Sequence, residues 1–323
     1  MALPPGVAEG RTRVRVTRRG ATAVLVAAAL AGTGFTYARP LTVFEAVGDA
    51  RLRLSGVRSD QVQAGPYRLR YLEAGSGEPL VLVHGLGSSA TLEWGRLLAP
   101  LGRRFHVYAP DLPGFGESER PATADYSIPM QVESVRAFMQ AKGIGRARMA
   151  GVSMGGWIVA RLAGEHPEVV ERLVLVDAAG MRPEDPGLPA RAMNLLPQDV
   201  EGVRRMAATV RHNAPAIPDF VARDILARRL KEEWILRRAL ESMRDGDDWL
   251  DGTLGRADMP VLVVWGKQDA LIPVADAARL AAEFRHADVR VLDGCGHVPV
   301  ADCPEAFDRE VLPFLAANVP TRP

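Results

Sequence analysis

The feature that most constrains the fold is a series of six short, mainly apolar runs rich in Val and Leu. They are Pro79–Gly85, Phe105–Asp111, Ala147–Ser153, Arg172–Ala178, Val261–Gly266 and Asp288–Gly294. Continuous β-rich runs of this length are typical of strands buried on both faces of a sheet. Helical patterns lie between several of them, for example from Pro129 to Gly143. This alternation predicts an α/β layered fold with a mostly parallel sheet.

Two segments depart from the alternation. The stretch "VRSDQVQAGPYRLRYLEAG", which begins at Val57, alternates around a Gly-Pro pair and predicts an antiparallel hairpin. Residues 181–258 show no clear strand pattern and look helical, and a structureless loop of that length would be improbable. We therefore expect a helical insertion at about 181–258 that covers one end of the sheet.

The N-terminal segment differs from the rest of the chain. A run of 19 uncharged residues, Gly20 to Ala38, follows a cluster of arginines: Arg11, Arg13, Arg15, Arg18 and Arg19. Such a run is long enough to span a bilayer, and it also fits a secretory or twin-arginine signal. A packed N-terminal helix is the alternative. We expect residues 1–40 to be a signal peptide or membrane anchor, 41–56 a linker, and 57–319 a domain outside the cytoplasm.

Composition narrows the classes of function. The 40 Lys and Arg residues and 39 Asp and Glu residues give a formal net charge of +1, so no bulk attraction to nucleic acid is expected. The two cysteines, Cys295 and Cys303, are too few for a disulfide framework, and free thiols are expected rather than one bridge. The sequence contains no metal-ligand motif, phosphate loop or nucleotide fingerprint, so neither metal nor cofactor is expected.

The pentapeptide "GVSMG", Gly151 to Gly155, directly follows a predicted strand and opens a predicted helix. It matches G-x-S-x-G, whose middle residue occupies a sharp, strained turn between strand and helix. Larger side chains two positions away would collide with the adjoining backbone, which explains the two glycines. The hydroxyl of Ser153 then projects beside a helix N-terminus, so we expect Ser153 to be a nucleophile.

A serine hydroxyl needs a base, and the base needs a group that orients it. Among six histidines, His297 lies in a turn past the last predicted strand, where such sheets place their sites; only His84 competes in position. Two acids follow predicted strands: Asp269 in "WGKQDALIP", and Asp177 before the insertion. Both give the chain order Ser, Asp, His. The "WGKQD" loop favours Asp269 as the orienting acid, with Asp177 anchoring a turn.

Acyl transfer also needs hydrogen-bond donors for the oxyanion. The loop "HGLGSS", His84 to Ser89, follows an early predicted strand, and its glycines let the backbone approach a substrate. We expect the donors to be the backbone amides of Leu86 and of Met154, which is next to Ser153. The alternative is that "HGLG" forms a plain tight turn.

These motifs together resemble the α/β-hydrolase superfamily over roughly residues 57–319. The resemblance rests on "VLVHGLGSS", "APDLPGFGES", "GVSMGG", "VDAAG", "VVWGKQDALIP" and "GCGHVP", in the superfamily's order. Within it, the chain looks like monoacylglycerol-lipase-type and bacterial lipase or esterase members with an N-terminal membrane segment. The resemblance implies an eight-stranded sheet with a helical cap between the sixth and seventh strands. It also implies hydrolysis of small-molecule carboxylic esters or acylglycerols, with Ser153, Asp269 and His297 as the triad.

Other activities occur on the same fold. Dehalogenases and epoxide hydrolases resemble this chain but use an aspartate where Ser153 stands. Carbon–carbon bond hydrolases also use serine; they often have Asn before the serine and Trp after the histidine, where this chain has Val152 and Val298. They remain the alternative function. A catalytically silent, membrane-tethered binding protein is a further alternative, although the intact Ser, Asp and His set argues against it.

Overall fold

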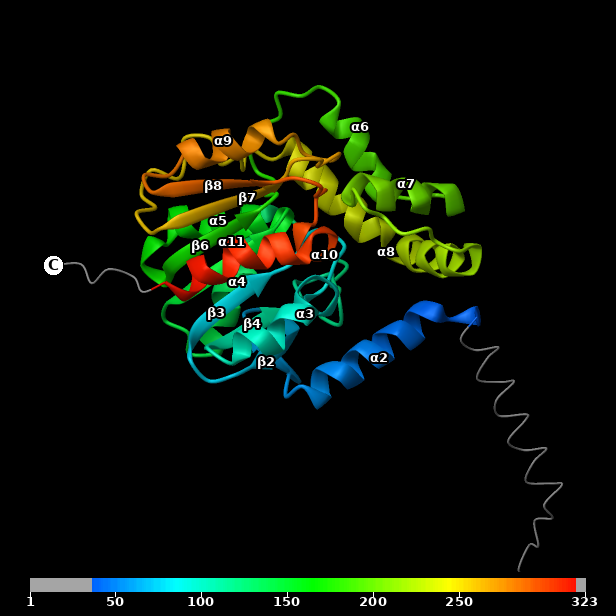
Figure 1. Cartoon of the computed structure of the whole chain (residues 1–323), viewed down its shortest axis with the longest axis horizontal. Coiled ribbons are helices and arrows are strands. Elements are labelled where there is room, and N and C mark those ends of the chain that lie inside the picture. Colours follow the sequence, from blue (N-terminus) through cyan, green and yellow to red (C-terminus); the bar gives the residue numbers. More distant parts are fainter. Residues whose placement is uncertain (1–36, 318–323) are drawn as a thin grey trace, which may run out of the picture.

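The structure, a computed structural model, describes residues 37–317, with one eight-stranded sheet at the centre (Figure 1). The strand order is β1-β2-β4-β3-β5-β6-β7-β8. β2 pairs antiparallel with β1 and β4, and every other neighbouring pair is parallel. This confirms the predicted mostly parallel sheet. The strands are β1 (Arg58–Ala64), β2 (Tyr67–Ala74), β3 (Glu78–Val83), β4 (Phe105–Pro110), β5 (Ala147–Val152), β6 (Val170–Val176), β7 (Val261–Gly266) and β8 (Ala287–Leu292).

The apolar runs are continuous because the side chains on both faces of each strand are buried. Successive side chains on a strand point to opposite faces of the sheet. In β3, Leu80 and Leu82 belong to one core cluster, while Val81 and Val83 belong to the other, and all four are fully buried. A strand covered on both sides has no solvent face and therefore no polar alternation.

Helices cover both faces of the sheet (Figure 1). The layer that packs on Val81 and Val83 contains α4, α5 and α9, and the layer that packs on Leu80 and Leu82 contains α3, α10 and α11. Their bounds are α3 (Ala90–Gly102), α4 (Ile128–Ala141), α5 (Met154–Glu165), α9 (Ala275–Ala282), α10 (Pro299–Asp302) and α11 (Pro304–Ala316), with a 3-10 turn at Pro167–Val169.

The segment between β6 and β7 forms the cap. Its regular elements are α6 (Leu188–Ala192), a 3-10 turn (Met193–Leu195), α7 (Val200–Val210) and α8 (Asp219–Asp245), so the predicted helical insertion is confirmed. Figure 1 shows α7 and α8 beside one end of the sheet. Ile235 and Leu236 of α8 are buried in the core cluster that contains Val81 and Val83. Arg238 donates hydrogen bonds to the carbonyls of Ala122 and Ala124. These contacts fix α8 to the sheet domain.

The residues expected to be a linker form a helix, α2 (Pro40–Leu54), that contacts both α8 and α3. The amide of Leu41 donates to Asp224 Oδ2 at 3.0 Å, and Glu45 forms an ion pair with Arg228. The segment 41–56 is therefore attached to the cap rather than merely joining two parts of the chain. The uncharged run Gly20–Ala38 lies almost wholly outside the described residues; within residues 37–317, no helix has both the length and the apolarity needed to cross a bilayer.

Candidate active site

Ser153 occupies a strained turn between β5 and α5. Its backbone φ of 54° and ψ of −119° lie in a region that residues other than glycine rarely adopt. The two flanking glycines are required by space. A Cβ atom at residue 151 would lie 2.3 Å from the carbonyl oxygen of Gly155, and one at residue 155 would lie 2.4 Å from that of Val83. The crowding predicted from the pentapeptide is therefore present.

The three side chains proposed from the sequence meet at the carboxyl ends of β5, β7 and β8. His297 Nε2 lies 2.9 Å from Ser153 Oγ, and His297 Nδ1 lies 2.7 Å from Asp269 Oδ2. The other oxygen of Asp269 accepts hydrogen bonds from the amides of Leu271 and Ile272 at 2.8 and 2.9 Å. The Asp269 side chain is 0% exposed and that of His297 is 4% exposed. This is a continuous hydrogen-bond chain from a buried carboxylate to a serine hydroxyl.

The second acid candidate, Asp177, lies beside this chain without bonding the imidazole. Its Oδ1 accepts a hydrogen bond from the amide of Gly266 at 2.8 Å, whereas its buried Oδ2 accepts none. Burial and the neighbouring Asp269 carboxylate raise the pKa of Asp177 well above its ordinary value. Sequence reasoning missed that the two acids are neighbours, because this contact depends on the pairing of β6 with β7.

A metal ion does not fit this cluster well. Oxygen and nitrogen atoms of Asp177, Asp269 and His297 lie within 4.8 Å of one another, a spacing that suits shared ligation of a cation. However, both imidazole nitrogens and both Asp269 oxygens already have hydrogen-bond partners. The arrangement is therefore explained by hydrogen bonding among the side chains.

His84, the competing histidine, has a structural role. It is completely buried, and its Nδ1 lies 2.8 Å from the carbonyl oxygen of Gly85, to which it donates. Its Nε2 accepts from the amide of Leu112 at 2.9 Å. Burial lowers the pKa of His84, so the ring is neutral. With both nitrogens engaged, His84 holds the "HGLG" loop in place.

The expected oxyanion donors flank the serine. A Cβ atom at Gly85 would lie 3.3 Å from Ser153 Cβ, so the loop that carries Leu86 passes directly beside the nucleophile candidate. Met154 is the first residue of α5, where a backbone N–H has no partner within the helix. Both amides are therefore located on backbone adjacent to Ser153.

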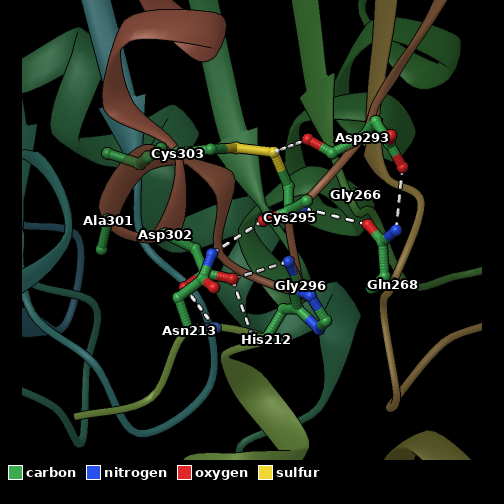
Figure 2. Close-up of a disulfide and its surroundings, with 12 residues drawn as sticks. His212, Asn213, Gly266, Gln268, Asp293, Cys295, Gly296, Ala301, Asp302 and Cys303 are labelled. Atoms are coloured by element: carbon green, nitrogen blue, oxygen red, sulfur yellow. Dashed lines mark hydrogen bonds between the residues drawn. A yellow bond between two sulfur atoms is a disulfide. The ribbon is translucent and has the colours of Figure 1, made fainter.

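The loop that carries His297 is held by a disulfide and a carboxylate (Figure 2). Cys295 and Cys303 are bonded, with their Cα atoms 5.6 Å apart, so the expectation of free thiols was wrong. Two cysteines form no recognisable disulfide pattern in the sequence. They are brought together by the tight turn of the chain through α10. Asp302 accepts a hydrogen bond from the amide of Gly296 at 2.7 Å. The same carboxylate accepts from the cap amides of His212 and Asn213.

Known proteins resemble this chain in sequence and in structure. A family model described as "alpha/beta hydrolase fold" matches residues 78–215. Lipase 3 of Moraxella sp. is 31% identical, over 70% of this chain and 74% of its own. A 2-hydroxymuconate semialdehyde hydrolase of Pseudomonas sp. is 30% identical, over 79% of this chain and 93% of its own.

A solved structure agrees with these similarities. A bacterial membrane phospholipase A, described as a virulence factor, superposes with a TM-score of 0.80 at 30% identity, covering 93% of this chain and 98% of that one. The two sequence relatives and the solved structure thus match this chain over most of their own lengths. The protein belongs to the α/β-hydrolase family.

Proposed function

We propose that the protein is a serine hydrolase that cleaves carboxylic esters, as a lipase or esterase, through an acyl-enzyme at Ser153. The observation that carries the proposal is the hydrogen-bond chain from Asp269 through His297 to Ser153. A base within hydrogen-bond reach of the hydroxyl, itself oriented by a buried acid, is what activates a serine for acyl transfer.

In the first half-reaction, Ser153 Oγ attacks the ester carbonyl carbon while His297 Nε2 takes the hydroxyl proton. The Asp269 carboxylate keeps the remaining proton on Nδ1 and stabilises the imidazolium that forms. Collapse of the tetrahedral intermediate breaks the bond to the alcohol oxygen, which receives the proton from Nε2. The alcohol leaves, and the acyl group remains on Ser153.

In the second half-reaction, water attacks the carbonyl carbon of the acyl-enzyme while Nε2 again accepts a proton. Collapse of the tetrahedral intermediate breaks the bond to Ser153 Oγ, which receives that proton, and the carboxylic acid leaves. In both steps the negative charge develops on the former carbonyl oxygen. The amides of Leu86 and Met154 are the proposed donors to that oxygen, because they lie on the two backbone segments that border Ser153.

A carbon–carbon bond hydrolase is the alternative function, since a relative named 2-hydroxymuconate semialdehyde hydrolase is 30% identical. The ester proposal is supported by the lipase relatives and by Val152 and Val298, which stand where carbon–carbon bond hydrolases often have Asn and Trp.

The proposal extends to location: the catalytic domain acts outside the cytoplasm, attached to the membrane by the segment before residue 40. The Cys295–Cys303 disulfide supports an oxidising compartment. The arginine cluster followed by an uncharged run supports export, and one structural relative is a membrane phospholipase.

The test uses p-nitrophenyl esters with acyl chains from two to sixteen carbons, monoacylglycerols, and a 2-hydroxy-6-oxodienoate as the carbon–carbon substrate. We expect ester hydrolysis, labelling of Ser153 by a fluorophosphonate, and a fall in turnover of about 10⁴-fold or more in folded Ser153→Ala. Faster cleavage of the dienoate than of every ester selects the alternative. Absence of labelling and of all hydrolysis in the folded wild-type protein selects a silent binding protein.

A further inference from the structure

Arg229, on the cap helix α8, lies against the "HGLG" loop. Its Nη1 atom is 2.3 Å from the position that a Cβ atom at residue 87 would occupy, and its Cζ atom is 3.3 Å from it. Gly87 has a φ of 68°, which also favours glycine. The guanidinium therefore occupies the space that a side chain on this loop would otherwise fill.

Arg229 differs from the other arginines of α8 in its contacts with the described residues. Arg228 pairs with Glu45, and Arg237 pairs with Glu233. The remaining arginines of the helix also bond carboxylates or carbonyls: Arg223, Arg238 and Arg244. Within residues 37–317, no hydrogen bond or ion pair is formed by Arg229.

The surroundings of Arg229 disfavour an unpaired charge. Desolvation lowers the pKa of Arg229; the nearby Glu232 raises that pKa and the adjacent Arg228 lowers it. Among the described residues, Glu232 forms its ion pair with Arg120, at 3.5 Å, and not with Arg229. Arg229 is half-buried, and because its guanidinium forms no ion pair with the described residues, its N–H donors are available to an anion from outside the chain.

The position of Arg229 relative to the nucleophile is set by the loop. Gly85 lies beside Ser153, and Gly87 lies beside Arg229. Two residues of backbone span at most about 7 Å. A chain of six single bonds covers a similar length, which is the number of bonds between the ester carbonyl carbon and the phosphorus of a 1-acylglycerol 3-phosphate.

We propose that Arg229 binds an anionic group, a phosphate or a carboxylate, located several bonds from the carbonyl that Ser153 attacks. The substrates are then anionic esters, such as acylated glycerol phosphates, rather than neutral ones. This inference rests on the proposed ester hydrolysis at Ser153. A planar guanidinium suits both anions because it donates two parallel hydrogen bonds.

The experiment compares matched pairs of esters with the full-length protein. The phosphate pair is 1-acylglycerol 3-phosphate against the monoacylglycerol of the same chain. The carboxylate pair is mono-p-nitrophenyl glutarate against p-nitrophenyl pentanoate. For each pair the ratio of kcat/KM, anionic over neutral, is measured in wild type, Arg229→Gln, Arg229→Lys and Arg237→Gln. Arg237 is the matched control, because it lies on the same helix and pairs with Glu233.

We expect wild type to prefer the anionic member of at least one pair, and Arg229→Gln to lower that ratio by about 10- to 100-fold, as for loss of a charged hydrogen bond. Arg229→Lys should recover part of the ratio, and Arg237→Gln should keep it. The pair with the larger ratio identifies phosphate or carboxylate as the natural group. Because Arg229 forms no hydrogen bond or ion pair within residues 37–317, Arg229→Gln should melt no lower than wild type.

Two results would overturn the inference while leaving the esterase proposal intact. One is a wild-type protein that hydrolyses neutral esters and shows no preference for the anionic member of either pair. The other is an unchanged ratio in Arg229→Gln. If the variant fails to fold, the wild-type ratios still decide the question. Absence of all hydrolysis together with absence of fluorophosphonate labelling overturns both proposals.

Discussion

Replacing each of the two neighbouring acids by asparagine distinguishes their roles. In Asp269→Asn, the amide oxygen can stay with the amides of Leu271 and Ile272, which places the NH₂ group against His297 Nδ1. The imidazole must then carry its proton on Nε2, where it cannot accept the proton of Ser153. Turning the amide around instead opposes its NH₂ group to two backbone N–H donors. The turned orientation is therefore disfavoured, and the first orientation, which removes the base, prevails. We expect turnover to fall by about 10⁴-fold, as for this change in serine proteases.

Asp177→Asn should behave differently. Since burial and the Asp269 carboxylate raise the pKa of Asp177, its carboxyl keeps a proton under conditions where ordinary aspartates are ionised. Asparagine has the same shape and charge as that protonated group. It can accept from the amide of Gly266 through its oxygen and direct its NH₂ group toward Asp269. We expect turnover within a few fold of wild type and a change in the free energy of unfolding within about 1 kcal/mol near pH 4.

The pH dependence of stability adds a second readout. A carboxyl whose folded pKa is raised holds its proton in the native state after the unfolded chain has released it at an ordinary value of 3.8. Wild type therefore loses stability as the pH rises from about 4 toward the raised pKa. Asp177→Asn lacks this loss, so it should become progressively more stable than wild type as the pH rises through that window.

The assay is turnover at saturating p-nitrophenyl ester, with folding checked by circular dichroism and unfolding followed in urea at several pH values. The reasoning is refuted if folded Asp177→Asn loses turnover while Asp269→Asn keeps it, because the orienting acid would then be the one that follows β6. A stability difference that does not depend on pH would refute the protonated state assigned to Asp177.

Three further predictions concern the backbone and the location of the protein. Gly155→Ala should cost about 3 kcal/mol or more in urea unfolding, because its Cβ would meet rigid backbone oxygens, whereas Gly48→Ala in α2, with nothing within 4 Å, should be neutral or stabilising. Replacing Cys295 and Cys303 by serine should lower the free energy of unfolding by about 2–3 kcal/mol, and dithiothreitol should give wild type the same melting temperature as the variant. After cell fractionation the protein should be found with membranes or outside the cytoplasm; full-length protein in the soluble cytoplasmic fraction would exclude both an anchor and export.

The parts of the fold that were predictable from the sequence are those encoded locally. Each buried strand is a continuous apolar run, because both of its faces are covered. The turn at Ser153 is marked by glycines whose absent side chains leave room for backbone two residues away. The cap was recognisable because a long segment without strand pattern interrupts a regular alternation.

Contacts between distant segments were not predictable in the same way. Asp177 and Asp269 both follow strands, so chain order did not distinguish them, and only the three-dimensional pairing brings one of them to His297. The attachment of α2 to α8 and the approach of Arg229 to Gly87 depend on how the cap is seated on the sheet. The local sequence of α2, of α8 or of the loop at Gly87 does not predict these contacts.

The carboxylate of Asp302 has a consequence for how a substrate can enter. It joins the link between α7 and α8, at His212 and Asn213, to the loop that carries His297. Lifting the cap at this link would break the hydrogen bonds that His212 and Asn213 donate, and would leave Asp302 bonded to the His297 loop alone. An opening at a different part of the cap would keep all three hydrogen bonds to Asp302 intact.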